Sequence, residues 1–455
     1  MDANVAPNHA GDTMIEAVPE AMLPDSHPGR AGIQGNPTVT LVKDRGRFGP
    51  VPGSRLVNNL SWAVGFMELA NAGDFAANVW NDVPVPAVAV VFMAVGGTVA
   101  AVLSGFAFFD AGLACRNVGF LRRQRRLQTA ERARRLLRAG PVLDMDVYMA
   151  VTLRELGSEV SARWFMDLLL GCGAVLIAAG TYMAIAGANG GVWLASNILS
   201  GYLGNAPVVL YGLVSFAWAL YIFCKAQGHV TATRKVLRGS RAAALVKRRS
   251  RHVQVFCVIN GTATVLGGVG SMMTATMWWG YVVLVPVIAS SLFCNVWWRR
   301  RVGYTRSAPD DFPPLDPSCL VRDLEFAARA EVTIREHRTS PMRQFVADPS
   351  SLPDVLAFLQ QHGLLDLYCL KIISTDALCS ALGGNQSDEV NLGVDGLLAV
   401  PEPLHARLLE AAQECLGEFG LEHFKNRERY TAELLGTYYT IASNVDFYGN
   451  MTQEK

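Results

Sequence analysis

Five long apolar stretches between Val85 and Trp298 constrain this chain more than any other feature of its 455 residues. Each is long enough, as a helix, to cross most or all of the roughly 30 Å hydrocarbon core of a bilayer. Charged residues make up 17% of the chain, against about 25% in a typical soluble domain. The sequence therefore predicts a polytopic bundle of transmembrane helices, with clear spans at 85–109, 164–187, 206–223, 253–274 and 278–298.

Arginine and lysine are concentrated in the connections on one side of these spans. Residues 111–163 carry eleven Arg and five acidic residues, and residues 225–252 carry nine Lys and Arg with no acid. Arg299, Arg300 and Arg301 follow the fifth span directly. Basic connections stay on the cytosolic side because their translocation is disfavoured. Five spans place all three clusters on that side, which predicts cytosolic loops and a cytosolic C-terminus.

Residues 56–80 are the ambiguous element of this topology. Trp62 and Trp80 are spaced to reach both interfaces of a bilayer along a helix. The stretch also contains Glu68 and Asp74, and a charged residue at mid-membrane costs about 2.5–3.5 kcal/mol on insertion. It either crosses the membrane, which makes six spans, or lies at the interface as an amphipathic helix. Both alternatives stay open, and the lack of a cleavable signal peptide before it favours six spans.

The flanking regions differ in composition from the membrane part. Residues 1–54 are rich in Pro, Gly, Asn and Asp, which predicts a disordered tail. Residues 302–317 form a Pro-rich acidic linker. Residues 318–455 show apolar residues at helical spacing and predict a small helical cytosolic domain, in which Gly420 separates two of the last helices. The predicted fold class is therefore all-α throughout.

The C-terminal region is acidic where the connections are basic. From Val302 to Lys455 there are 23 acidic residues against 12 Lys and Arg. Opposite fields on one membrane face favour docking of this domain onto the basic connections. Anionic membrane lipids compete for the same Arg and Lys, each of which is worth about 1 kcal/mol near the surface. We expect the lipids to be the partner of the basic connections, with domain docking as the alternative.

Residues 56–80 carry a polar stripe on an otherwise apolar helix. If the helix crosses the membrane, the stripe must face the bundle interior or a water-filled path, because unpaired carboxylates in hydrocarbon are expensive. That arrangement predicts a cation or proton relay, or a site for a polar substrate. If the helix lies at the interface, the stripe is the face of the helix that contacts water. Its members fall within one arc of the helix: Glu68, Asn71, Asp74 and Asn78.

The second and fourth spans contain two further sets of candidate residues. Asp167 lies one turn after Arg163 near the start of the second span, so an ion pair between them is expected, with a role in a transport path as the alternative. The fourth span carries small and polar side chains at three- and four-residue steps, which favour a helix-packing face over an ion path. These residues are Asn260, Thr264, Gly268 and Ser271.

Motifs of known chemistry are missing from the sequence. The nine cysteines and eight histidines show no zinc, redox or intramembrane metal spacing, and no nucleotide-binding or nucleophile motif occurs. The Arg-rich run at 122–138 has Leu at helical spacing and few aromatic residues, which is typical of a membrane-surface helix and not of a nucleic-acid binder. We therefore expect no catalytic residue, no metal, no cofactor and no nucleic-acid partner.

Residues 58–86 read NNLSWAVGFMELANAGDFAANVWNDVPVP. This segment, together with the layout of spans as far as Arg301, resembles predicted integral membrane proteins of filamentous fungi. That family has no assigned activity, so the resemblance implies a membrane location and little more. The tail and the C-terminal domain contain no motif that adds to it.

Three functions are compatible with these patterns. The first is a non-enzymatic membrane protein that anchors, scaffolds or senses through its acidic domain and basic connections. The second is a small transporter or channel, working as a homo-oligomer, that uses Glu68, Asp74 and Asp167. The third is an intramembrane enzyme that uses the same carboxylates. The missing catalytic motifs favour the first function, and both the plasma membrane and the endoplasmic reticulum are compatible with it.

Overall fold

The computed structural model describes residues 38–453 except 45, 81–83, 188, 309–311, 375–377, 380–381 and 383–387, with side chains described as far as Asn444. Helices form 78% of the structure and strands are few, which confirms the predicted all-α bundle. In the described part of the chain, five helical stretches are long and apolar enough to cross a membrane. These five stretches are compatible with a multi-pass membrane protein. The predicted disorder of residues 1–37 lies outside the described residues.

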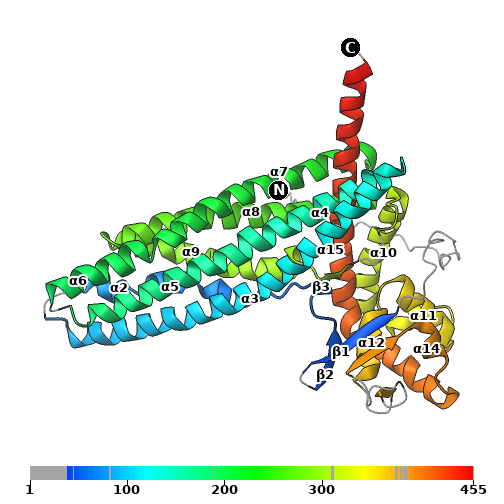
Figure 1. Ribbon diagram of the computed structural model, residues 1–455, viewed down its shortest axis with the longest axis horizontal. Helices are drawn as coiled ribbons and strands as arrows, with labels where there is room; N and C mark the ends of the chain where they lie inside the picture. Colours follow the sequence, from blue (N-terminus) through cyan, green and yellow to red (C-terminus); the bar gives the residue numbers. More distant parts are fainter. Residues whose placement is uncertain are drawn as a thin grey trace, which may run out of the picture.

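The crossing helices lie side by side in an elongated bundle (Figure 1). They run alternately between the end that carries the C-terminal domain, here called the domain end, and the opposite far end. Short π-helical turns (η2, η3, η4) interrupt or extend them. The bounds are α3 (Ala87–Leu137), α4 (Leu143–Glu159), η2 (Val160–Trp164), α5 (Phe165–Ala184), α6 (Gly190–Asn197), η3 (Ile198–Leu203), α7 (Ala206–Val236), α8 (Arg241–Thr274), α9 (Trp279–Trp297) and η4 (Trp298–Val302).

The basic connections predicted at 111–163 and 225–252 are largely helical. Only the short turns 138–142 and 237–240 separate α3 from α4 and α7 from α8. α3 has 51 residues and is therefore about 76 Å long at 1.5 Å per residue, more than twice the thickness of the hydrocarbon core. Arg and Lys are good helix formers, and neighbouring helices stabilise the extensions by packing. The bundle therefore continues well beyond the membrane at its domain end.

The connection between the second and third spans also differs from the expected loop. α6 and η3 continue into α7, so the third helical stretch begins at Gly190 and not at residue 206. Gly180 of α5 permits the close approach of this stretch, because a Cβ atom there would lie 2.7 Å from the Cβ of Ser200. Residues 188–205 contain no charged side chain, so they can lie against apolar surroundings.

Residues 56–80 traverse the bundle, but they do not form one helix. They contain the short helices η1 (Ala63–Phe66), α1 (Glu68–Ala72) and α2 (Phe75–Val79). The segment starts at the domain end, where Asn58 donates to the Arg299 carbonyl, and α2 lies at the far end (Figure 1). Because α3 then returns from the far end, the chain makes six traverses of the bundle. The expectation of a continuous helix is therefore wrong, while the burial of Glu68, Asn71 and Asp74 inside the bundle favours the crossing alternative over the interfacial one.

Side chains of the neighbouring helices satisfy the irregular backbone at the start of this segment. The Ser61 N–H donates to the Asp110 carboxylate at 2.9 Å. Arg299 donates to the Leu60 carbonyl at 3.1 Å, and Asn295 donates to the Ser61 carbonyl at 2.9 Å. Backbone groups away from water need such partners, so the polar residues around the segment permit its breaks.

The break between α1 and α2 lies directly against α3. A Cβ atom at Gly96 of α3 would lie 1.9 Å from the carbonyl oxygen of Gly73, closer than real atoms approach. A Cβ atom at Gly73 would lie 2.8 Å from the carbonyl oxygen of Gly96. The two backbones touch because both positions lack a side chain.

The residues before the bundle form strands that join the C-terminal domain. β1 pairs antiparallel with β2 and with β5, and β3 pairs with β4. The predicted disordered tail of residues 1–54 is therefore wrong from Val39 onward. Val39 and Leu41 are buried at alternate positions of β1, so the strand packs one face against the domain. The strand bounds are β1 (Val39–Asp44), β2 (Arg47–Pro50), β3 (Arg55–Leu56), β4 (Arg306–Ser307) and β5 (Glu389–Leu392).

The C-terminal domain is mainly helical, as predicted. Tyr368 and Phe424 are fully buried in its core. Gly420 does not end a helix, because the last helix runs through it, and a Cβ atom there would lie 3.1 Å from Ile334 of the helix alongside. The bounds are α10 (Pro317–Glu336), η5 (Pro341–Gln344), α11 (Leu352–Gln361), α12 (Leu365–Ile373), α14 (Val394–Leu398), η6 (Glu402–Leu404) and α15 (His405–Gln453).

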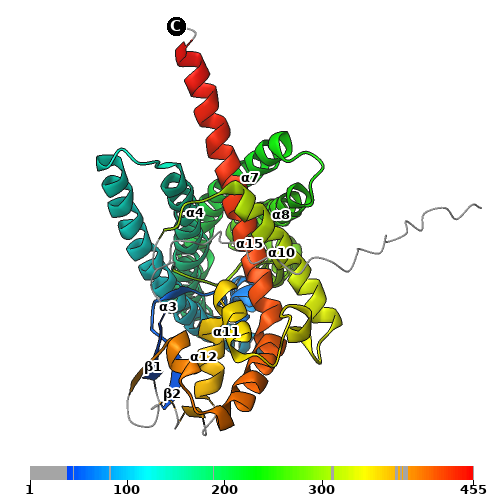
Figure 2. The same ribbon diagram turned by 90° about the vertical axis from the view of Figure 1, so that its right-hand side faces the viewer.

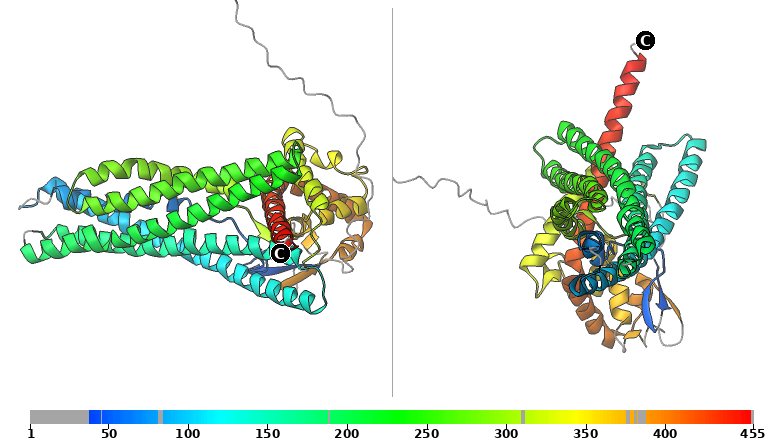
Figure 3. Two further views of the ribbon diagram at one scale, coloured as in Figure 1. Left: turned by 90° about the horizontal axis from the view of Figure 1, so that it is seen from above. Right: turned by 90° about the vertical axis from the view of Figure 1, so that its left-hand side faces the viewer.

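α15 lies across the domain end of the bundle and joins it to the domain (Figures 1 and 2). It packs against α4, α7 and α8 as well as against α10. Leu245 and Val246 of α8 share a buried apolar cluster with Ala432 and Leu435 of α15. Seen from above, the domain sits at one end of the bundle only (Figure 3). Docking of the acidic domain onto the basic helices is therefore observed.

Candidate functional site

Arg163 is the centre of a buried ion-pair network near the domain end. Its Nη2 lies 3.0 Å from Asp110 of α3, and its Nη1 lies 3.0 Å from Glu159, one turn earlier. Nη1 also donates to the side-chain carbonyl of Asn59 at 2.9 Å. Glu159 accepts a further hydrogen bond from Asn117 at 3.0 Å. These contacts tie α3, η2 and the broken segment together inside the bundle.

Asp167 lies beside this network but does not pair with Arg163. The predicted ion pair is wrong because the guanidinium of Arg163 is turned toward Asp110 and Glu159. The π-helical turn η2 inserts a residue between Glu159 and Asp167 and shifts the register of that helix face. The Asp167 carboxyl is fully buried against the carboxyl of Asp110. Neither of its oxygens accepts an N–H or hydroxyl hydrogen bond from the described residues.

The charges of this network do not balance. Among the described residues, the ion pairs of Asp110 and Glu159 are with Arg163 alone, while Asp167 forms none. Three carboxyl groups therefore share one guanidinium in a buried place. Unpaired negative charge is costly in a buried place. Two carboxyl groups in contact reduce this cost by sharing a proton, which also gives their oxygens a hydrogen-bond partner. The geometry therefore allows this cluster to take up a proton.

Glu68 lies on α1 between α8 and the rest of the bundle. Its side chain is buried, and its Oε2 accepts a hydrogen bond from Asn71 at 2.7 Å. A Cβ atom at Gly267 of α8 would lie 3.7 Å from both carboxylate oxygens, so the carboxylate lies next to the backbone of α8. The prediction that the polar stripe faces the bundle interior is confirmed for Glu68 and Asn71.

A partly open cavity of about 70 Å³ lies beside Glu68. A buried water needs about 10–15 Å³ on this measure, so the cavity has room for a few waters. Glu68 and Arg163 both line it, and Tyr211, Asn260 and Asn295 add polar groups to its wall. The cavity therefore connects the carboxylate of α1 to the ion-pair network at the domain end.

The other half of the polar stripe lies nearer the far end. The Asp74 side chain is fully buried, and its Oδ1 accepts from the Tyr281 hydroxyl of α9 at 2.8 Å. Its Oδ2 accepts from the Asn78 amide at 2.9 Å, and Asn78 also donates to the Tyr281 oxygen at 3.0 Å. The break at Gly73 thus divides the stripe into a buried pair, Glu68 and Asn71, and a second pair in which Asp74 is buried and Asn78 is half-buried.

The predicted packing face of α8 meets α7. A Cβ atom at Gly212 of α7 would lie 2.6 Å from the Thr264 carbonyl oxygen, and the Ser271 carbonyl accepts from Asn205 at 2.7 Å. Close backbone contact of this kind requires small residues. Asn260 belongs to this face and to the wall of the cavity. The residues of the face are those predicted: Asn260, Thr264, Gly268 and Ser271.

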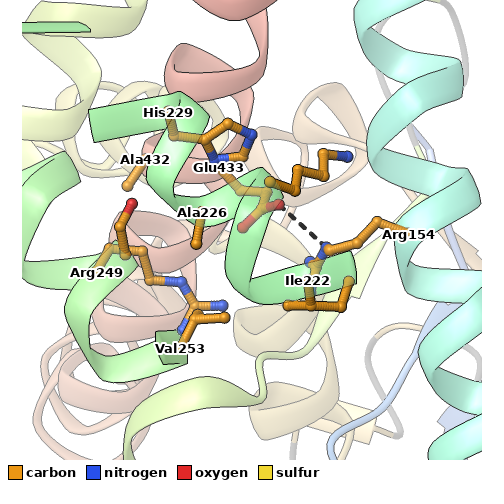
Figure 4. A pocket seen from close by; sticks show the side chains of 10 residues that line it. Arg154, Ile222, Ala226, His229, Arg249, Val253, Ala432 and Glu433 are labelled. Atoms are coloured by element: carbon orange, nitrogen blue, oxygen red, sulfur yellow. Dashed lines mark ion pairs between the residues drawn. The ribbon is translucent and has the colours of Figure 1, made fainter. Parts of the chain in front are cut away.

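A second charged cluster lies where α15 meets the bundle. Glu433 of α15 is buried, and its Oε1 lies 3.1 Å from Nε of Arg154 on α4. Lys225 and His229 of α7 and Arg249 of α8 line the same small cavity. Figure 4 shows Arg154 and Arg249 on opposite sides of Glu433. This cluster, here called the docking cluster, places one carboxylate among several cations.

The electrostatics of the docking cluster favour the charged form of Glu433. Burial alone raises the pKa of this carboxyl, but the cations around it, led by Arg154, outweigh burial and lower the pKa from 4.5 to about 2. The carboxylate is therefore charged throughout the physiological pH range. It anchors α15 to the bundle by charge as well as by packing.

Other ion pairs between the domain and the bundle differ in exposure. Glu155 of α4 pairs with Arg306, whose Nε lies 2.8 Å from Oε1, and both residues are buried. Arg248 pairs with Glu428 of α15 at 2.7 Å, but the Arg248 side chain is 53% exposed. Salt screens exposed pairs far more than buried ones, so only part of the docking depends on ionic strength.

Sequence reasoning missed three residues of these sites. Asp110 follows the predicted end of the first span by one residue and was assigned to neither span nor connection. Glu159 shares a four-residue spacing with Arg163 and Asp167, a signal that was available but was overlooked. Tyr281 had no signal in the sequence, because only the position of α9 brings its hydroxyl to Asp74.

The comparisons of this chain with known proteins give no relative. No family model, no curated protein and no solved structure matches it. Within the part of the chain that the structure describes, no group of three His, Cys, Asp and Glu side chains is arranged to hold a metal ion. The argument for function therefore rests on the geometry of the two charged clusters.

Proposed function

We propose that this protein moves protons across its membrane through the carboxyl groups of the bundle interior. The observation that supports this most directly is the buried Glu68 carboxylate beside a cavity that has room for water and that also reaches Arg163. An anchoring bundle does not need a carboxylate at this depth, where an unpaired charge is costly. A carboxyl group that exchanges a proton with internal water does need this setting.

The arrangement supplies successive proton-binding positions along the bundle. The Asp110 and Asp167 pair lies near the domain end, Glu68 lies beside the cavity, and Asp74 lies nearer the far end. Waters in the cavity would connect the first two positions by short hydrogen-bonded steps. Tyr281 gives Asp74 a hydroxyl partner that both donates and accepts protons.

The broken segment supports the same function. Non-helical backbone at membrane depth is tolerated where it is buried in protein or lines a cavity, and transport proteins place their sites at such breaks. Here Glu68 and Asp74 lie on opposite sides of the break at Gly73. The π-helical turn before Asp167 is a second irregularity of a kind that is frequent at functional sites.

A flux measurement on the reconstituted full chain tests this proposal. We expect proton uptake into liposomes, recorded with an enclosed pH-sensitive dye under an imposed membrane potential. Glu68→Gln is expected to reduce the rate at least about tenfold, since the amide keeps the shape but cannot exchange a proton. Asp146→Asn, at a half-exposed ion pair of α4, is the matched control and should leave the rate unchanged. Equal flux in wild type and Glu68→Gln would overturn the proposal.

A second candidate function is sensing or scaffolding through the C-terminal domain. The observation that favours it is the docking of α15 on α4, α7 and α8, because a rearrangement of the bundle would reach the domain directly. Limited proteolysis of the linker in the full chain tests it. Sensing predicts that the cleavage rate changes with pH in the wild type and not in Glu68→Gln. A rate equally independent of pH in both proteins would leave α15 as a static anchor.

The proposal also includes the orientation of the protein in its membrane and its contacts with lipids. Exposed arginines gather on the part of α3 near the domain end, at Arg122, Arg125 and Arg126 among others. This placement supports a domain end that faces the cytosol and contacts anionic headgroups. Protease added outside sealed, cytosolic-side-out vesicles should then cut the linker 302–317. Membership in the fungal membrane-protein family, the choice of membrane and the homo-oligomeric state stay predictions.

A further inference from the structure

The docking cluster encloses a small cavity that the proton path does not use. The cavity measures about 10 Å³, room for about one water-sized group, and lies among α4, α7, α8 and α15 (Figure 4). Its charged lining consists of Arg154, Lys225, Arg249 and Glu433, with His229 beside them. The cavity belongs to the contact between bundle and domain.

The charges around this cavity are strongly positive. Arg154, Lys225 and Arg249 bring three cations, and Glu433 is the acidic residue in the lining. The nearby Glu155 does not correct the balance, because Arg306 and the Tyr304 hydroxyl occupy its oxygens. A buried surplus of positive charge is costly unless an anion compensates it.

Some hydrogen-bond donors of Arg249 have no acceptor among the described residues. It is 4% exposed, and its Nη1 donates to the Arg301 carbonyl at 2.9 Å. Its Nε and Nη2 donate to no acceptor among the described residues. A guanidinium that is buried with unused donors is rare, because each donor loses its hydrogen bonds to water without replacing them.

Lys225 adds donors on the same cavity. Its Nζ is bonded to the Ala150 carbonyl at 3.0 Å. An ammonium group carries three donors, so two remain for another acceptor. Arg249 and Lys225 thus both belong to the lining of one small cavity, and each has donors that the described residues do not use.

We infer that the docking cluster is a binding site for a monatomic inorganic anion, with chloride as the physiological species. The size of the cavity excludes phosphate and sulfate while Glu433 is in place, and its donors are those that charge-assisted anion binding requires. The bound anion would neutralise part of the positive surplus and hold α15 on the bundle. This site lies outside the proton path, and its test does not use flux.

Thermal unfolding of the full chain in detergent tests this inference. Chloride is titrated against gluconate at constant ionic strength, because gluconate is too large for the cavity. We expect the midpoint of the wild type to rise with chloride and then to level off, as binding to the native state requires. Arg249→Gln should weaken the apparent chloride affinity roughly tenfold or more, since it removes a charged donor.

Two further variants extend this test. One predicts the direction of a change in chloride affinity, and the other is a control. Glu433→Gln removes the resident negative charge, so it should tighten chloride binding even though it weakens docking. Arg251→Gln, on an exposed position of the same helix, should leave the chloride dependence unchanged. Identical midpoints in chloride and gluconate, or weaker chloride binding in Glu433→Gln, would overturn the inference. If Arg249→Gln does not fold, Lys225→Gln takes its place with the same expected weakening.

Discussion

The bundle interior and the docking cluster are both buried and both charged, but their charges are opposite. Around Arg163, three carboxyl groups share one guanidinium. Around Glu433, several cations share one carboxylate. Each surplus needs a compensating species from outside the side chains, and the two species differ. Protons suit the interior cluster, and an anion suits the docking cluster.

The two regions also differ in the backbone that presents their charges. In the interior, Glu68 and Asp74 come from short helices separated by a break at Gly73. In the docking cluster, regular helices supply every charged group, and α15 is continuous through Glu433. A broken segment leaves room for water beside its side chains, whereas packed regular helices leave a cavity of one small group. The difference supports the proposed proton exchange in the interior and a stable attachment at the docking cluster.

The largest expected effect comes from a substitution that disturbs the packing of the bundle interior and leaves the docking cluster unchanged. Gly96→Ala places a methyl group on the Gly73 carbonyl oxygen and should destabilise the protein by about 3 kcal/mol or more, despite the better helix propensity of Ala. Gly105→Ala is the matched control on the same helix, because nothing lies within 4 Å of its Cβ position. Thermal unfolding of both variants in detergent measures this. Equal midpoints would show that α1 and α2 do not press on α3.

An effect of similar size is expected from removing the central cation of the interior. Arg163→Gln leaves Asp110 and Glu159 buried without their partner, which should cost about 3–5 kcal/mol at neutral pH. Acidification should reduce this cost because the carboxyl groups then bind protons and become neutral. Thermal midpoints at pH 7.5 and pH 5 check both statements. A deficit that stays the same at both values would contradict the proton-binding role of the cluster.

The docking cluster is expected to respond to acidification at lower pH than the interior cluster does. The pKa of Glu433 is about 2 in the folded protein, against 4.5 ordinarily, so the unfolded chain binds the proton more tightly. Its contribution, about 3 kcal/mol, should be complete above about pH 4.5 and should disappear as pH falls toward 2. The difference in unfolding midpoint between wild type and Glu433→Gln measures it. A difference that grows on acidification would refute the assignment.

The sequence alone determined the membrane part of the fold. Runs of apolar residues long enough to cross a bilayer need no tertiary contact to be recognised, because the bilayer itself is the partner that buries them. The basic connections and the acidic C-terminal domain could be read from composition, but the continuation of α3, α7 and α8 through those connections could not. The stripe of Glu68, Asn71, Asp74 and Asn78 was also readable, because periodicity along one segment is a local property.

Only the tertiary structure decided how the charged residues pair. The contacts Arg163–Asp110, Tyr281–Asp74 and Arg154–Glu433 join residues that are far apart in the chain. The break at Gly73 depends on the backbone of α3 at Gly96, and α15 continues through Gly420 because α10 lies against it. Burial sets whether a charge needs a partner, and burial is a property of the assembled helices. The composition of a single segment therefore does not determine which of its charges are buried.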